Sequence, residues 1–380
     1  MTDFKTWRTP MAWEEAFRPG CEQSNEVVAR LRSSPPLVFA RECDLLTERL
    51  AQVAGGEGLV LQSSEHTQSL GSLSADAIMG RLRTLLQMAA VLSYAASVPV
   101  VKIVRLALPD QEPTGILRGY ESSAAALNLV RALVSGGYAD LGQIHEWNRD
   151  FVSRSPARDR YTALADEMGR ALSFMRACRP TSARPAAAEY FVCHEALPLV
   201  YESALTHVDS QTGNRYNTAG HFVRIGARSR EHGGVYSEYI DHFTAIRNPI
   251  GVEIGPGTQP DYLLGLLDQL DPAREPGRLT FLVRMGAAPL RDELPELIEK
   301  VMAEDRQVGW ICTPVSEGPG LRRFGGIPDE VTAFFEVHQA LGTHPGGFTA
   351  DLTADVSASL DLAFLAAESY RADRMIPLRT

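Results

Sequence analysis

The chain has 380 residues, enough for one large domain or two ordinary ones, and 44% of them are apolar, as in globular proteins. A net charge of −10 excludes a basic face of the kind that binds nucleic acid or an anionic membrane surface. Five cysteines without a CxxC pair exclude a disulfide framework and a zinc knuckle, and a start that lacks an apolar leader makes the cytoplasm the expected location.

In chain order, the first 55 residues are predicted to be helical, with amphipathic segments near 22–33 and 41–54. Eight short apolar runs follow, and they alternate with segments that have the period of a helix. The runs are GLVLQ (58–62), VPVVKIV (98–104), AEYFVC (188–193), HFVRIG (221–226), IGVEIG (250–255), LTFLVRMG (279–286), GWICTPV (309–315) and GGFTADL (346–352). The clearest helices between them span 260–270, 290–305 and 328–341.

Eight strands separated by helices favour an α/β protein with a parallel sheet that closes into a (β/α)8 TIM barrel over residues 56–380. A doubly wound open sheet is the alternative, although no GxGxxG motif opens a helix after a strand as a Rossmann dinucleotide site requires. Residues 1–55 then form an N-terminal helical extension. A helical insertion of about 106–187 separates the second strand from the third, and it is expected to decorate the barrel or to build a dimer contact.

Arginines gather where the predicted strands end, which is where the active site of a TIM barrel lies. These residues are Arg105, Arg224, Arg228 and Arg284. Because the planar guanidinium group matches carboxylate and phosphate oxygens, they predict a binding site for a small anionic metabolite. The alternative is that each arginine pairs with a structural acid.

Other polar side chains at the strand ends suggest acid–base or metal chemistry. The candidates for a general acid or base are His66, His194 and Glu253. For Glu253 the alternative is a salt bridge with Arg224, and a histidine after a strand is more often a hydrogen-bonded core residue. His66, Glu317 and Asp351 could instead form a metal site of mixed nitrogen and oxygen ligands.

Several longer segments carry distinctive motifs. They include CHEALPLVYESAL (193–205), GHFVRIGARSREHGGVYSEYIDHFTAIRNPIGVEIGP (220–256), GRLTFLVRMGA (277–287), WICTPVSEGPG (310–320) and FFEVHQALGTHPGGFTADLTAD (334–355). In this order they resemble motifs of the type II, plant-like, 3-deoxy-D-arabino-heptulosonate 7-phosphate (DAHP) synthases. The chain most resembles the compact bacterial members found beside secondary-metabolite genes, and the resemblance covers nearly all of it.

The resemblance implies a TIM barrel that condenses phosphoenolpyruvate with erythrose 4-phosphate and uses a divalent metal held by a cysteine, a histidine, a glutamate and an aspartate. These positions fall on His66, on Ser316 with Glu317 beside it, and on Asp351, while the segment with the fourth ligand is absent. Because no family ligand is kept as such, no cofactor is expected. The alternative is a remodelled site for Mn, Co or Mg on His66, Glu317 and Asp351.

The substrate-binding residues that the resemblance implies are kept only in part. The family's phosphoenolpyruvate-binding arginines match Arg105 and Arg284, and a third arginine matches Arg228. Its tryptophan and lysine positions are Arg224 and Glu253, and its KPRS segment, which helps to hold erythrose 4-phosphate, has no counterpart. The predicted barrel mouth therefore keeps arginines that can bind an anion, while the residues around them differ from those of the family.

Three functions are compatible with this pattern. The predicted one is an enzyme of secondary metabolism that has diverged to metal-independent formation or cleavage of carbon–carbon bonds, or to proton transfer, on a substrate with a carboxylate or phosphate. The second is a genuine DAHP synthase with a rebuilt site, and the third is a non-catalytic scaffold or regulatory protein. Since family enzymes often assemble as dimers and their N-terminal segment contributes contacts, a homodimer is expected.

Overall fold

The computed structural model describes residues 22–64, 74–106, 113–178, 189–196, 198–226, 230–231, 234–235, 237–314, 326–352 and 356–374. Its centre is a closed barrel of parallel strands in the order β1-β12-β11-β10-β9-β6-β3-β2. The strands are β1 (Leu59–Ser64), β2 (Val100–Arg105), β3 (Phe191–Glu195), β6 (Phe222–Ile225), β9 (Ile250–Ile254), β10 (Leu279–Val283), β11 (Gly309–Cys312) and β12 (Gly347–Asp351). The closed order confirms the predicted (β/α)8 barrel and excludes the open sheet.

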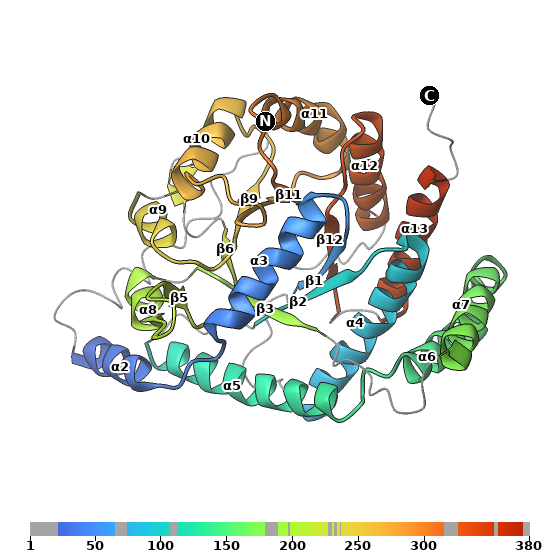
Figure 1. The fold of residues 1–380 in the computed structure, drawn as a ribbon, viewed down its shortest axis with the longest axis horizontal. Helices are drawn as coiled ribbons and strands as arrows, with labels where there is room; N and C mark the ends of the chain where they lie inside the picture. The colour runs from blue at the N-terminus through green and yellow to red at the C-terminus, as the bar shows by residue number, and fades with distance from the viewer. Residues whose placement is uncertain are drawn as a thin grey trace.

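Helices surround this barrel (Figure 1). The helices that come between successive barrel strands, or after the last one, outside the predicted insertion are α4 (Ala75–Ala96), α8 (Leu199–Ala204), α9 (Ser237–Thr244), α10 (Pro260–Leu270), α11 (Ala287–Ala303), α12 (Ile327–Ala340) and α13 (Val356–Arg374). Two small antiparallel hairpins extend the loops, β4 (Thr206–Val208) with β5 (Arg215–Asn217), and β7 (Arg230–Glu231) with β8 (Gly234–Val235). None of the described helices is both long and apolar enough to cross a membrane.

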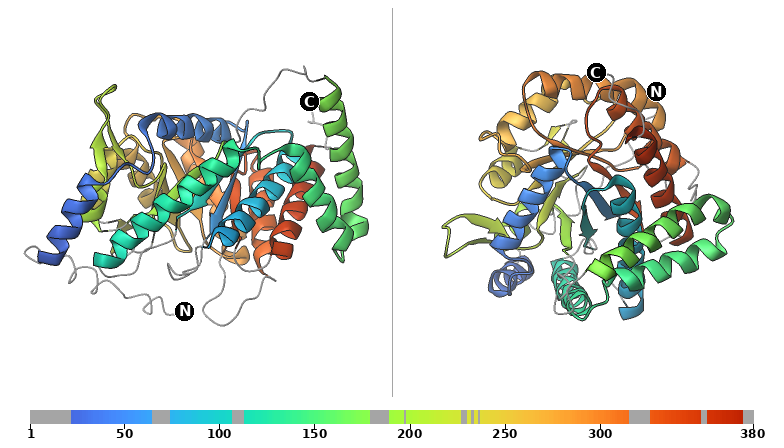
Figure 2. Two further views of the ribbon diagram at one scale, coloured as in Figure 1. Left: turned by 90° about the horizontal axis from the view of Figure 1, so that it is seen from below. Right: turned by 45° about the vertical axis from the view of Figure 1, so that its right-hand side comes forward.

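The predicted insertion is helical where the structure describes it. It contains α5 (Pro113–Ser135), α6 (Leu141–Arg154) and α7 (Arg158–Cys178). Figure 2 shows α6 and α7 as a hairpin on the outside of the helix ring. There Arg160 donates to Glu368 of α13 over 2.7 Å, and the ring of Tyr161 stacks on Phe364 with centroids 4.4 Å apart. The hairpin therefore packs on the outer side of α13 and does not form part of the barrel mouth.

The N-terminal segment contributes α2 (Glu22–Ser33) and α3 (Ala40–Ala54), and α3 lies across one end of the barrel (Figure 1). Leu46, Leu50 and Val53 of α3 pack into the lumen with side chains from the strands. Gly277, just before β10, has φ +81°, and a Cβ there would lie 2.1 Å from the carbonyl oxygen of Thr47. This close approach requires glycine, so α3 closes the amino-terminal end of the barrel. The division into residues 1–55 and 56–380 stays a prediction.

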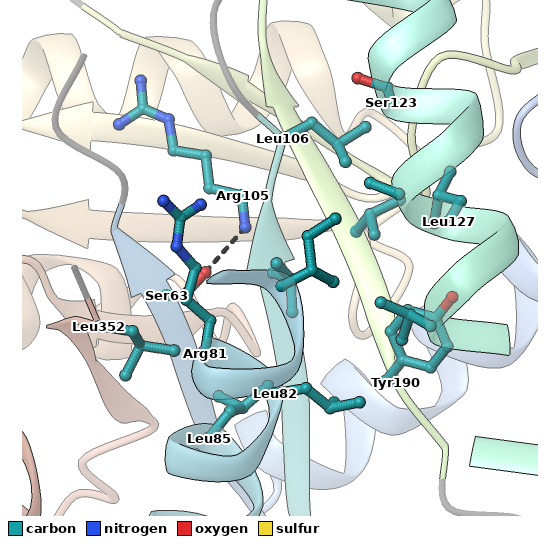
Figure 3. Close-up of a pocket in the computed structure, with 15 residues that line it drawn as sticks. Ser63, Arg81, Leu82, Leu85, Arg105, Leu106, Ser123, Leu127, Tyr190 and Leu352 are labelled. Atoms are coloured by element: carbon teal, nitrogen blue, oxygen red, sulfur yellow. Dashed lines mark hydrogen bonds between the residues drawn. The ribbon is translucent and has the colours of Figure 1, made fainter. Parts of the chain in front are cut away.

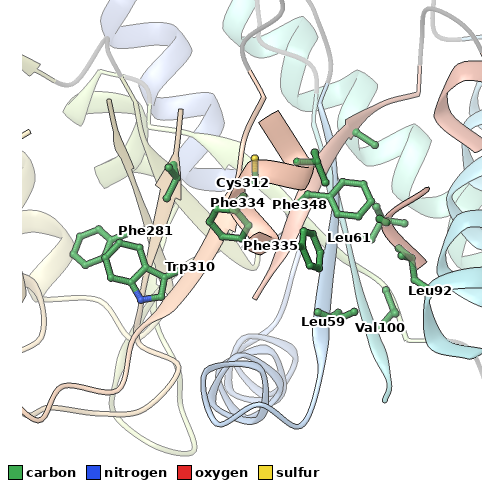
Figure 4. Close-up of a cluster of buried hydrophobic side chains, with 14 of the residues drawn as sticks. Leu59, Leu61, Leu92, Val100, Phe281, Trp310, Cys312, Phe334, Phe335 and Phe348 are labelled. Carbon is green, nitrogen blue, oxygen red and sulfur yellow. The ribbon is translucent and has the colours of Figure 1, made fainter. Parts of the chain in front are cut away.

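Alternate residues of each strand face the lumen or the helices, as the period of two requires. Val60, Ile103, Phe222 and Ile311 belong to the lumen cluster. Their neighbours along the strands belong to a second cluster under the helices, in which Phe334 and Phe335 of α12 pack beside Phe348 (Figure 4). The strands are buried on both faces, which explains why the sequence shows continuous apolar runs.

Candidate active site

Charged side chains replace apolar ones at the carboxyl end of the lumen. On five neighbouring strands the lumen-facing position nearest this end holds a charge, and the signs alternate around the barrel. In barrel order these residues are Arg105 (β2), Glu195 (β3), Arg224 (β6), Glu253 (β9) and Arg284, which directly follows β10. We call these five residues the charge ring.

The period of two shows that the charge ring faces inwards. Ile103, Cys193 and Leu282 all lie in the lumen cluster, each two residues before a member of the ring. Gly251, two residues before Glu253, also faces the lumen, because a Cβ there would lie 2.6 Å from the side chain of Phe222. The ring is therefore held by the same hydrogen-bonded strands that build the core.

Ion pairs connect the members of the ring. Arg105 pairs with Glu195 through Nη2 and Oε2. Glu253 lies between two guanidinium groups, with Oε2 3.5 Å from Arg224 Nη2 and Oε1 3.7 Å from Arg284 Nη1. The proposed salt bridge between Glu253 and Arg224 is thus present, and Arg284 shares the same carboxylate.

Pairing leaves part of this positive charge unsatisfied. Three guanidinium groups face two carboxylates, so the ring carries a formal net charge of +1. Among the residues that the structure describes, Nε of Arg105 and both Nε and Nη1 of Arg224 are buried without a hydrogen-bond partner. Burial, followed by the positive charge of Arg105, lowers the pKa of Arg224. Unpaired buried donors are costly, and an anionic ligand in the mouth would offset part of that cost.

A polar layer lies below the ring and above the apolar end of the lumen. The Gln62 amide donates to Cys193 Sγ over 3.0 Å and accepts from the Thr349 hydroxyl over 3.4 Å. Thr313 and Thr349 hydroxyls lie 3.3 Å apart. Gln62 is fully buried, so this layer separates the charges from the apolar floor.

Sequence reasoning did not select Glu195 or Gln62 as site residues. The sequence analysis chose His194, the residue before Glu195. Glu195 lies two residues after the lumen-facing Cys193, so it faces the lumen as well. A Cβ on Gly226 would lie 2.8 Å from Glu195 Oε1, so the bend after β6 leaves room for this carboxylate. Strict alternation along 191–195 is the signal that would have found it.

His194 lies on the other face of β3, outside the lumen. Its Nε2 is 3.0 Å from Glu202 Oε2 of α8, and Asn217 donates to the same carboxylate oxygen. His194 and Glu202 are 6% and 0% exposed. His194 therefore packs the strand against α8 on the face that points away from the lumen, and its acid–base role stays a prediction.

Of the candidate metal ligands, His66 and Glu317 lie outside the described residues, and only Asp351 lies within them. The predicted substrate-binding Arg228 also lies outside them. Asp351 ends β12 and pairs in register with Ser64 of β1, and its backbone oxygen accepts from Ser359 over 2.7 Å. Within the described ranges, no three potential ligands come together.

Topology nevertheless relates these three candidates. β1, β12 and β11 are neighbours in the barrel. His66 follows the end of β1, Asp351 ends β12, and Glu317 follows β11 in the sequence. One imidazole and two carboxylates are ligands that suit Mn or Co, and carboxylates also suit Mg. The donor set therefore fits a divalent metal.

Lys102, the lysine within a barrel strand, does not face the mouth. Lys102 follows a lumen-facing residue of β2 and so faces outwards, where its Nζ donates to its own strand at Val100 over 2.9 Å. Burial lowers its pKa. In the described part of the chain, no lysine belongs to the charge ring.

A separate cavity lies outside the barrel wall, between β2, α4 and α5 (Figure 3). Its lining is mainly apolar, including Leu82, Leu85 and Leu127, with Arg81 at one side. Ser63 lines it and accepts a hydrogen bond from the backbone N–H of Arg105 over 3.0 Å. The cavity thus touches the backbone behind the ring but is separated from the mouth by the strands.

Comparisons with known proteins agree with one another. Residues 2–108 and 109–362 match the model of the class-II DAHP synthetase family. The chain is 44% identical, over an alignment of 440 residues, to phospho-2-dehydro-3-deoxyheptonate aldolase from Streptomyces coelicolor, with 96% of this chain and 97% of that protein covered. It is 38% identical to phospho-2-dehydro-3-deoxyheptonate aldolase AroG from Mycolicibacterium smegmatis, over 91% of this chain and 83% of that protein.

These matches overturn the expectation that no cofactor is needed, because class-II enzymes are metal-dependent. That expectation assumed that a metal-ligand position of the family no longer binds metal when it holds a different residue type. An imidazole can replace a thiolate, and a carboxylate can replace an imidazole, while both still bind divalent ions.

Proposed function

Because this chain belongs to the class-II DAHP synthetase family, we propose that it condenses phosphoenolpyruvate with erythrose 4-phosphate and water to give DAHP and inorganic phosphate. The observation that carries the proposal is the inward-facing pair Arg105 and Arg284. These match the family's phosphoenolpyruvate-binding arginines, and they lie on the lumen side of β2 and just after β10. The aldolases from S. coelicolor and M. smegmatis match along most of their length, which supports the same reaction.

In this proposal each charged residue has a distinct part. Arg284 is 35% exposed in its side chain, so it can bind a carboxylate or phosphate directly as the substrate enters. Arg105 is only 14% exposed and is paired with Glu195, which holds its guanidinium in place. A guanidinium fixed beforehand loses little entropy on binding, and it stabilises negative charge that develops on the substrate.

The metal that the family requires would be held by His66, Glu317 and Asp351, which follow or end three neighbouring strands. When bound, such a metal acts as a Lewis acid that polarises a carbonyl oxygen. The buried Gln62 and Thr349 beneath the mouth keep a polar floor there. The arginines and this floor orient the reacting groups and limit the water around them.

A diverged reaction on another anionic substrate is the second candidate. Glu253 favours it, because this carboxylate stands where the family has a lysine and lies between two arginines of the ring. A purely non-catalytic scaffold has less support. A scaffold would not require buried guanidinium groups in the lumen whose donors, in the described part of the chain, have no partner.

The test is product formation by the purified protein. Phosphoenolpyruvate and erythrose 4-phosphate are supplied with Mn²⁺, and released phosphate and DAHP are measured together. We expect both products in equal amounts, loss of activity after chelation, and recovery when Mn²⁺ is returned. If phosphoenolpyruvate binds but neither product forms with any of Mn²⁺, Co²⁺ or Mg²⁺, the proposed reaction is wrong and the diverged reaction is favoured.

A further inference from the structure

Glu253 is held less tightly than other paired carboxylates of the molecule. Its contacts with Arg224 and Arg284, the ones found among the described residues, measure 3.5 and 3.7 Å. By contrast, Glu275 makes two hydrogen bonds of 2.7 and 2.8 Å to Arg247. Charge-assisted hydrogen bonds of this kind are about 2.7–2.9 Å long. The carboxylate of Glu253 therefore retains capacity to accept hydrogen bonds.

The position of Glu253 makes this capacity accessible from the mouth. Its side chain is 16% exposed, whereas that of Arg224 beside it is 3% exposed. Arg224 cannot rise to close the gap without leaving its buried site, and Arg284 is the more exposed partner on the other side. A ligand that binds Arg284 therefore finds an acceptor directly beside its anionic group.

The charge of Glu253 also limits what can bind there. A second anionic group next to this carboxylate would be repelled, while a hydroxyl or an ammonium group would be attracted. Its neighbours in the ring cannot cancel the charge of Glu253 fully, because Arg224 directs only Nη2 at it, and Nε and Nη1 of Arg224 have no partner within the described ranges.

We propose that Glu253 determines substrate specificity: it accepts a hydrogen bond from a hydroxyl or ammonium group that lies next to the carboxylate or phosphate bound by Arg284. This inference deepens the second candidate function, the diverged reaction, and it rests on the proposal that the mouth binds a small anionic substrate. Phosphoenolpyruvate carries a phosphate beside its carboxylate and no such donor, so Glu253 should disfavour it. The inference assigns Glu253 to ligand recognition in place of acid–base catalysis. The favoured substrate class is an acid or sugar phosphate with such a donor beside its anionic group.

Three ligands with one carbon skeleton test this proposal. They are 3-phosphooxypropionate, 3-phosphoglycerate and O-phospho-L-serine, which carry hydrogen, hydroxyl and ammonium, respectively, beside the carboxylate. Their dissociation constants are measured by calorimetry at fixed ionic strength. For the native protein we expect the ammonium ligand to bind about tenfold more tightly than the hydrogen ligand, with the hydroxyl ligand between them.

Two substitutions at Glu253 and one elsewhere in the ring complete the design. Glu253→Gln should bring the three constants within about twofold of one another, and Glu253→Lys should make the ammonium ligand the weakest. Glu195→Gln removes the same charge from the same ring, two strands away, and should leave the order of the ligands unchanged. Binding of inorganic phosphate by each variant shows that its mouth is folded.

Equal affinities in the native protein, or an unchanged order in Glu253→Gln, would overturn the assignment. So would the same loss of order in Glu195→Gln, because the effect would then come from net charge alone. Failure of all three ligands to bind would also overturn it. Since no turnover is measured, absence of DAHP formation alongside an intact ligand order would reject the proposed reaction and retain the role of Glu253.

Discussion

Below the charge ring, towards the closed end of the barrel, Phe222 and Leu282 belong to the lumen cluster that also contains Leu50 of α3, and both are fully buried. Two residues further along the same part of the chain, Arg224 and Arg284 face the open end and pair with a shared carboxylate. The alternation of the strands is the same in both places, and only the height along the barrel differs. The closed end therefore contributes mainly to stability, and the open end carries donors and acceptors that a ligand can use.

The largest effect on stability is expected at the closed end. Phe222→Ala removes a fully buried ring from the lumen and leaves a cavity, because strands in a closed barrel cannot collapse inwards. We expect the free energy of unfolding to fall by about 3–5 kcal/mol. Chemical denaturation measures it, and a loss below about 1 kcal/mol would show that the two ends do not differ as described.

At the open end, a substitution should change ligand affinity strongly and stability only slightly. Arg284→Ala should change the free energy of unfolding by less than about 0.5 kcal/mol, because this side chain is partly exposed and loosely paired. Affinity for phosphoenolpyruvate should fall about 100-fold, equivalent to about 2.7 kcal/mol. Arg291→Ala is the matched control, since Arg291 has a similar exposure but pairs with Asp329 away from the mouth. Equal losses of affinity in both variants would contradict the assignment of Arg284.

The closed end should also carry a pH dependence of stability through His338. Burial, and then the charge of His344, lowers the pKa of His338 to about 3. His338 thus binds a proton less readily in the folded protein than in the unfolded chain, in which a histidine has a pKa of about 6.5. Stability should fall as pH decreases from about 6.5 towards 3, by up to about 1.4 kcal/mol per pH unit.

His338→Asn separates this contribution from that of other groups. Asparagine can keep a polar atom near the place of Nδ1, which contacts Thr343 over 2.8 Å, but it does not titrate. Thermal unfolding across the same pH range should then show a shallower slope. An unchanged slope would assign the pH dependence to another group.

The smallest change in the free energy of unfolding is expected for Arg224 in the charge ring, where stability and ligand affinity should respond differently. Arg224→Met removes a buried guanidinium that has two nitrogens without a partner among the described residues, while Glu253 keeps Arg284 and some solvent. Because buried ion pairs are often replaced by apolar side chains without loss, and Glu253 keeps a second partner, the free energy of unfolding should stay constant or rise by about 1 kcal/mol. Phosphate affinity should fall at the same time. A destabilisation above about 2 kcal/mol would show that Arg224 contributes net stability.

Much of the barrel could be predicted from local patterns, and much of the site could not. The run 250–255 predicted β9, which spans Ile250–Ile254, since strands buried on both faces are continuously apolar. The position of His194 on the outer face of its strand was not predicted, because a place at a strand end does not specify which face a side chain occupies. The packing of α3 into the lumen was not predicted either, since an amphipathic helix pattern does not identify the surface that it covers.

By itself, the amino-acid sequence determined the family, the eight strands and the strand ends at which Arg105, Arg224, Glu253 and Arg284 stand, because these follow from motifs and short-range periodicity. Only the tertiary structure decided that β2, β3, β6, β9 and β10 are consecutive in the barrel, so that five separate charges form one alternating ring. The physical reason is that neighbours and register in a closed sheet are set by packing between residues far apart in the chain. Local periodicity specifies only the alternation within each strand.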